Sequence, residues 1–133
     1  MTSRHMQTAL SIIFIGLGAW CLLMPGMVES LVFRPQFQHL SATSMILMGC
    51  FGAQAVLAGL VILTSDFRPS TFLVFGLFGS LPFFAFNYYF YFSAKIFSEW
   101  MLLDFAGNIG ILTLGLLGYH TRKKEISDAS VVS

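Results

Sequence analysis

The sequence predicts an all-α integral membrane protein in which four transmembrane helices form an up-down-up-down bundle. Three observations predict this fold. Hydrophobic residues make up 56% of the 133-residue chain and charged residues only 10%, whereas soluble domains carry about 25% charged residues. A chain this short is too small to bury so much apolar surface in a water-soluble core. In addition, four apolar segments each approach or exceed the roughly 20 residues that a helix needs to cross a bilayer.

The first two predicted spans end at helix-breaking or charged residues. The first covers residues 7–24 and stops at Pro25-Gly26. Because no small-x-small cleavage site follows it, we expect a retained span and not a secretory signal peptide. The second span covers residues 40–64 and ends before the charged, proline-containing segment 66–69.

The last two spans complete a single domain over residues 1–124. The third covers residues 70–92 and contains Pro82, which predicts a kink in the middle of that helix. The fourth covers residues 100–119 and stops before a run of basic residues. Residues 125–133 are polar and small, so we expect a disordered C-terminal tail.

The short connections and the basic residues predict the topology. Connections of a few residues after the second and third spans make neighbouring helices antiparallel. Lys and Arg then fall unequally on the two sides, with Arg4, Arg68, Arg122, Lys123 and Lys124 on one side and Arg34 and Lys95 on the other. Because short cytoplasmic segments carry the excess of basic residues, we expect both termini to be cytoplasmic.

The first outer loop, residues 25–39, is longer than the other connections. Its segment 28–33 mixes apolar and polar positions, which is typical of a helix lying flat at the headgroups. The Arg34-Pro35 pair would end any such helix.

Small and polar residues predict which helix faces point into the bundle, because close packing drives helix association in lipid. On the fourth span the inward stripe is Asp104, Gly107, Asn108, Ile111, Gly115 and Gly118, and the lipid stripe is Phe105, Ile109, Leu112 and Leu116. On the third span the inward stripe is Gly76, Ser80, Phe83, Asn87 and Tyr91.

The second span has two candidate faces. One face carries Thr43, Leu47, Cys50, Gln54, Ala58 and Val61, and the nearly opposite face carries Gly49, Gly52, Ala55 and Gly59. The smooth Gly/Ala face predicts either self-association or contact with a membrane-protein partner, or close packing on the first span near Gly16 and Gly18.

Asp104 is the only acid inside a predicted span and is therefore the candidate for chemistry. Counting residues from the helix ends places Asn87, Asp104 and Asn108 at similar depths near the outer side, while Gln54 could extend the group inward. One interpretation is a polar pocket in which Asp104 is a general base, a proton carrier or a ligand anchor. The alternative is a hydrogen-bonded clamp between helices, with Lys95 neutralising Asp104.

Eight of the ten residues from 83 to 92 are aromatic. These rings, Tyr91 among them, fit either an aromatic belt at the headgroups or a slot for a lipid-like or quinone-like ligand. Trp20 and Trp100 would join the same belt.

Other classes of function lack their signals in the sequence. The net charge of +1 gives no basic field for nucleic acid. The three histidines and two cysteines show no metal-ligand spacing, and no standard nucleophile motif occurs. The sequence therefore favours a non-catalytic accessory or assembly subunit, or a bundle that binds a hydrophobic ligand. The alternative is a membrane-embedded enzyme or proton-coupled carrier built around Asp104.

Overall fold

The computed structural model describes residues 2–132, and this part of the chain is helical apart from its connections. Its elements are α1 (Ser3–Leu23), α2 (Pro25–Val32), the 3₁₀ turn η1 (Pro35–Phe37), α3 (Ala42–Thr64), α4 (Pro69–Phe78), α5 (Leu81–Tyr88), the π-helical turn η2 (Tyr89–Ser93) and α6 (Met101–Val132). Four helical segments are long and apolar enough to cross a membrane: α1, α3, the segment from α4 to η2, and α6. By length and composition, the described chain therefore has the four candidate membrane-spanning helices that hydropathy predicts.

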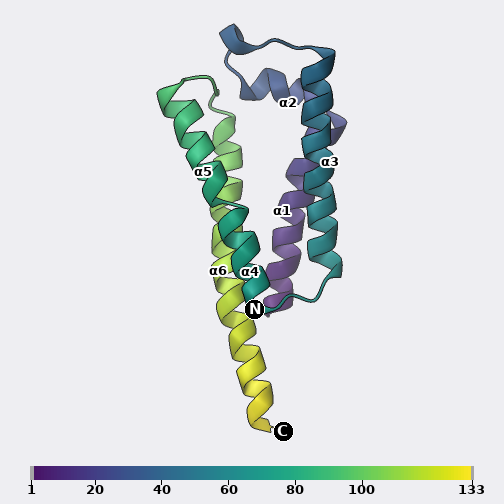
Figure 1. The fold of residues 1–133 in the computed structure, drawn as a ribbon, viewed down its shortest axis with the longest axis vertical. Helices are drawn as coiled ribbons and strands as arrows, with labels where there is room; N and C mark the ends of the chain where they lie inside the picture. The colour runs from purple at the N-terminus through teal and green to yellow at the C-terminus, as the bar shows by residue number, and fades with distance from the viewer. Residues whose placement is uncertain (1, 133) are drawn as a thin grey trace.

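The four long segments form two pairs. Helix α1 packs along α3, and α4 packs along α6, while a further contact between α1 and α6 joins the pairs (Figure 1). The pairs lie close together near the N-terminus and separate toward the end where α2 lies (Figure 1). We refer to these as the N-terminal end and the α2 end of the bundle.

Glycines bring α1 and α3 into backbone contact. A Cβ atom added at Gly52 would lie 2.6 Å from the carbonyl oxygen of Gly18, and one at Gly59 would lie 3.1 Å from that of Ser11. The Ser11 hydroxyl donates a 2.7 Å hydrogen bond to the Gly59 carbonyl across this contact. Of the two interpretations of the Gly/Ala face, the structure therefore supports close packing on α1. Gly49 is the exception, since nothing lies within 4 Å of its added Cβ.

A second glycine contact joins α4 to α6. A Cβ added at Gly76 would lie 2.9 Å from Cα of Gly115. The predicted inward stripe of α6 is confirmed, because Asn108, Ile111, Gly115 and Gly118 are buried and Asp104 and Gly107 are half-buried. At the kink predicted near Pro82 the structure has an interruption of the helix, since α4 ends at Phe78 and α5 begins at Leu81.

The prediction of a disordered tail is wrong for the described residues, because α6 continues to Val132. At 1.5 Å per residue its 32 residues extend about 48 Å, well beyond the roughly 30 Å of a bilayer core. The part of α6 after the basic run at 122–124 therefore projects past the other helices, as Figure 1 shows.

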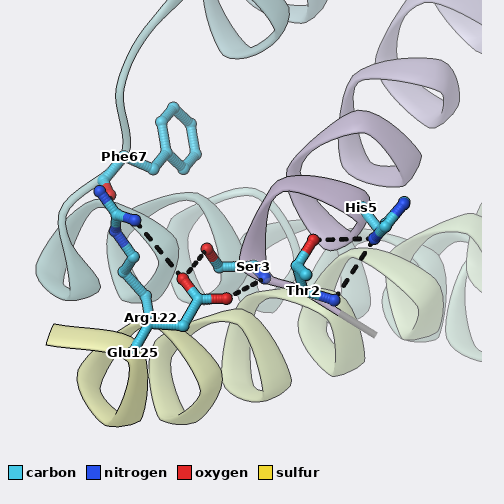
Figure 2. A network of polar contacts seen from close by, with 6 residues as sticks. All are labelled: Thr2, Ser3, His5, Phe67, Arg122 and Glu125. Atoms are coloured by element: carbon cyan, nitrogen blue, oxygen red, sulfur yellow. Dashed lines mark hydrogen bonds and ion pairs between the residues drawn. The ribbon is translucent and has the colours of Figure 1, made fainter. Parts of the chain in front are cut away.

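A polar network holds this projecting segment at the N-terminal end (Figure 2). The Ser3 hydroxyl and backbone N–H donate to the Glu125 carboxylate at 2.6 and 2.9 Å. Arg122 forms an ion pair with Glu125 at 3.4 Å and donates to the Phe67 carbonyl at 3.2 Å. The hydrogen bonds from Ser3, followed by the charge of Arg122, hold the pKa of Glu125 below its ordinary value. This network ties α1, the α3–α4 loop and α6 together.

Candidate functional site

A cavity of about 610 Å³ lies between the two helix pairs toward the α2 end. Its walls come from α1, α2, α3, the start of α5 and the first turns of α6, and most of its lining side chains are aliphatic or aromatic. The polar members of the lining are Cys21, Glu29, His39, Ser44, Asp104 and Asn108. The volume is typical of a small-molecule site, and such sites combine apolar walls with a few polar groups.

Backbone hydrogen bonds join two segments that are distant in sequence beside the cavity, at the α2 end. Ser98 N–H donates to the Val32 carbonyl at 2.7 Å, and Arg34 N–H donates to the Ile96 carbonyl at 2.9 Å. The Arg34 side chain adds a 2.9 Å bond to the Phe97 carbonyl. These bonds fix α2 against the segment that precedes α6, so the side chains of α2 become part of the cavity wall.

The structure brings together the three polar residues that depth counting placed at one level. Asp104 Oδ2 accepts a 2.9 Å hydrogen bond from the Asn87 amide and a 2.8 Å bond from the Asn108 amide. The first bond joins α5 to α6 and the second lies within α6. Asn87 and Asn108 are buried, and Asp104 and Asn108 also line the cavity. Asp104 thus links two helices and contributes a carboxylate to the site.

Glu29 is the residue of the site that sequence reasoning missed. It lies on α2, is only 4% exposed, and lines the cavity. Its Oε2 atom is buried and has no hydrogen-bond partner among the described residues. One sequence signal could have identified it, because Glu29 is the only acid in the long loop from 25 to 39 and sits within an apolar stretch.

The other candidate residues lie elsewhere. Gln54 is exposed on the outward side of α3 and does not line the cavity, so the structure does not join it to Asp104. Tyr91 is half-buried, with the Arg34 guanidinium 6.0 Å from its ring centre. The expected pairing of Lys95 with Asp104 is absent, because the ion pair within residues 2–132 joins Arg122 and Glu125.

The aromatic residues divide between the two interpretations. Phe83, Trp20 and Trp100 line the cavity. Tyr88, Tyr89 and other rings of the 83–92 run are exposed, as in an aromatic belt. The run therefore supplies one ring to the cavity wall, and much of the remaining run faces outward.

Comparison with known proteins does not assign the chain to a family. The chain matches no protein-family model, and it shows no significant similarity to a curated protein or to a solved structure. Within the described residues, no group of three or more His, Cys, Asp and Glu side chains is placed to hold a metal ion.

Proposed function

We propose that this protein is a non-catalytic membrane bundle that binds a hydrophobic small molecule between its two helix pairs. In this proposal the four helices cross the bilayer alternately, both termini are cytoplasmic, and the cavity lies toward the outer side. The excess of Lys and Arg at the N-terminal end supports that orientation.

The cavity is the observation that carries the proposal. Close-packed helix pairs bury their small residues against each other, yet here the pairs separate and leave about 610 Å³ between them. An apolar cavity of this size would accept a molecule with a hydrophobic body, which lipid or membrane-dissolved compounds can supply. The carboxylates of Glu29 and Asp104 would orient a polar group of the occupant.

The glycine contacts support a rigid scaffold for such a site. Gly18 and Gly52 set the spacing of α1 and α3, and Gly76 and Gly115 set that of α4 and α6. Because each pair is held by backbone contact, the helices that form each wall of the cavity are fixed relative to one another before a ligand binds.

Native mass spectrometry of the protein extracted from its own membrane tests this proposal. The two cysteines offer a matched pair of variants, since Cys21 lines the cavity and Cys50 is exposed on α3 outside it. We expect a reproducible small-molecule adduct on the wild-type chain and on Cys50→Trp, and its loss from Cys21→Trp. An adduct that survives Cys21→Trp would place the ligand elsewhere and contradict the proposal. A chemically altered product accumulating on incubation would favour the enzyme alternative.

The accessory-subunit function has one observation in its favour. Gln54 lies near the middle of a spanning helix and is exposed on its outward side. An amide facing hydrocarbon is unfavourable, whereas one hydrogen-bonded to another membrane helix is stabilising. Cys50 lies one turn earlier on the same face, so a thiol-reactive cross-linker at Cys50 should capture the neighbour in intact membranes. Gln54→Leu should reduce that capture, and unchanged capture would argue against this surface.

A further inference from the structure

The cavity also indicates which chemical class of ligand it takes. We propose that it binds an amphiphile with an ammonium head and an apolar body, the head lying between Glu29 and Asp104. This inference deepens the proposed function and rests on it. The observations that carry it are the charge of the lining, the unpartnered carboxylate of Glu29, and the aromatic rings around the site.

With the His39 imidazole counted as neutral, the formal charge of the described lining is entirely acidic. Glu29 and Asp104 both line the cavity, and neither Lys nor Arg is among the lining residues. In a site of low dielectric constant a carboxylate attracts a cation and repels a phosphate or carboxylate far more strongly than in water. The lining therefore selects against fatty acids and anionic lipid headgroups and favours a positive head.

Glu29 lacks a partner that such a head would supply. Its carboxylate is buried and Oε2 accepts no hydrogen bond from the described residues. Arg34 is the Lys or Arg residue closest to Glu29 in the sequence, and its guanidinium lies against the Phe97 carbonyl and the Tyr91 ring instead. A carboxylate buried without a donor or a cation is destabilising. An ammonium ion in the cavity would offer the missing charge and, where it carries N–H groups, the missing donors.

The remaining walls suit the other parts of such a ligand. The rings of Trp20, Phe33, Phe97 and Trp100 line the cavity, and aromatic faces attract ammonium groups, including quaternary ones. Aliphatic side chains from α1 and α3 complete the wall and would cover a hydrocarbon chain. One site thus combines carboxylates for the charge, rings for the head and apolar walls for the body.

Tryptophan fluorescence provides a direct test, because the chain has two tryptophans and both line the cavity. The probes are dodecyl chains that carry a trimethylammonium, hydroxyl or carboxylate head and a bromine on a chain carbon close to that head, because bromine quenches tryptophan only at short range. They are titrated into the full-length protein in a nonionic maltoside detergent. We expect the ammonium probe to quench at a concentration at least tenfold below that of the alcohol, and the carboxylate probe to bind most weakly.

Three variants connect this preference to the two acids. Glu29→Gln and Asp104→Asn should each reduce the ammonium preference at least fivefold, while Glu99→Gln should retain it. Glu99 is the matched control, since it is an exposed acid in the loop before α6 and does not line the cavity. Circular dichroism verifies folding. Should Asp104→Asn unfold, Glu29→Gln carries the test alone, because the Glu29 side chain makes no hydrogen bond that the substitution would remove.

The outcomes separate the two proposals. Equal binding of the ammonium and alcohol probes, unaffected by either variant, would overturn the ammonium inference and leave the hydrophobic site standing. Absence of saturable quenching by every probe would overturn both. A phosphatidylcholine with bromine on its acyl chains identifies the source of the ammonium. Half-maximal quenching at a concentration as low as that of the free ammonium probe assigns a choline lipid, and half-maximal quenching only at higher concentration assigns a lipophilic amine.

Discussion

Replacing Gly52 by alanine tests the scaffold on which the cavity depends. The new methyl group would lie 2.6 Å from the Gly18 carbonyl oxygen and 2.9 Å from the Cys21 carbonyl carbon, where ordinary contact begins at 3.4 Å. The nearest obstructing atom is the backbone nitrogen of Leu22, and all three are backbone atoms, so no side chain can rotate away and the two helices must move apart. Overpacking typically costs about 1–3 kcal/mol. Because this obstruction is backbone, we expect a cost at the upper end of this range, which the roughly 1 kcal/mol higher helix propensity of alanine reduces to a net loss of about 1–2 kcal/mol.

Gly49→Ala is the matched control for this prediction. Gly49 lies one turn earlier on the same helix, and nothing lies within 4 Å of its added Cβ. Alanine also favours helix over glycine by about 1 kcal/mol. Reversible unfolding in mixed micelles of nonionic detergent and dodecyl sulfate, followed by circular dichroism, should therefore show Gly49→Ala equal to or more stable than wild type. If both variants unfold together, within about 0.3 kcal/mol of each other, then α1 and α3 are not apposed at Gly52 and the reasoning fails.

Three other predictions concern the polar contacts. The contribution of Glu125 to the unfolding free energy should be constant above about pH 5. It should be lost as pH falls below the pKa of an unperturbed glutamate, about 4.3, because the folded pKa of Glu125 is depressed. Glu125→Gln should flatten this part of the curve. Ser3→Ala should flatten it partly, and an unchanged slope would contradict the network of Figure 2. Asn87→Ala should lower stability by about 0.6–2 kcal/mol, since it removes the bond between α5 and α6. In an Asp104→Ala background the same substitution should cost less, and a strictly additive double-mutant cycle would exclude the Asn87–Asp104 interaction.

The residues that sequence analysis placed correctly are those governed by local rules. The spans follow from hydropathy, and the inward stripe of α6 follows from helical spacing and small residues. The hydrogen bond between Asn87 and Asp104 follows from counting residues outward from the connection between the third and fourth spans. Residues at similar distances from that connection lie at similar depths on the two helices and can contact each other. Each of these depends on spacing along one or two neighbouring helices.

The features that sequence analysis missed or left open depend on contacts between distant segments. Glu29 reaches the cavity because Ser98 and Arg34 bond α2 to the segment before α6, and no local pattern predicts those pairings. The sequence leaves two candidate inward faces on α3, and glycine packing turns the face opposite Gln54 toward α1. The tail from Glu125 is helical where composition predicts disorder, with Ser3 and Arg122 holding its first turn.

The clamp and the ligand site are compatible roles for Asp104. Both amide donors bond to the same oxygen, Oδ2, and no described residue donates to Oδ1. A carboxylate held by one oxygen is fixed in orientation while its second oxygen keeps its capacity to accept a hydrogen bond or attract a cation. The interhelical bond thus positions the charge that a ligand would meet, as preorganised sites require. On this argument Asn87→Ala should weaken binding of the ammonium probe less than Asp104→Asn does, because it loosens the carboxylate without removing its charge. Equal losses in the two variants would show that the interhelical bond, and not the charge, determines binding.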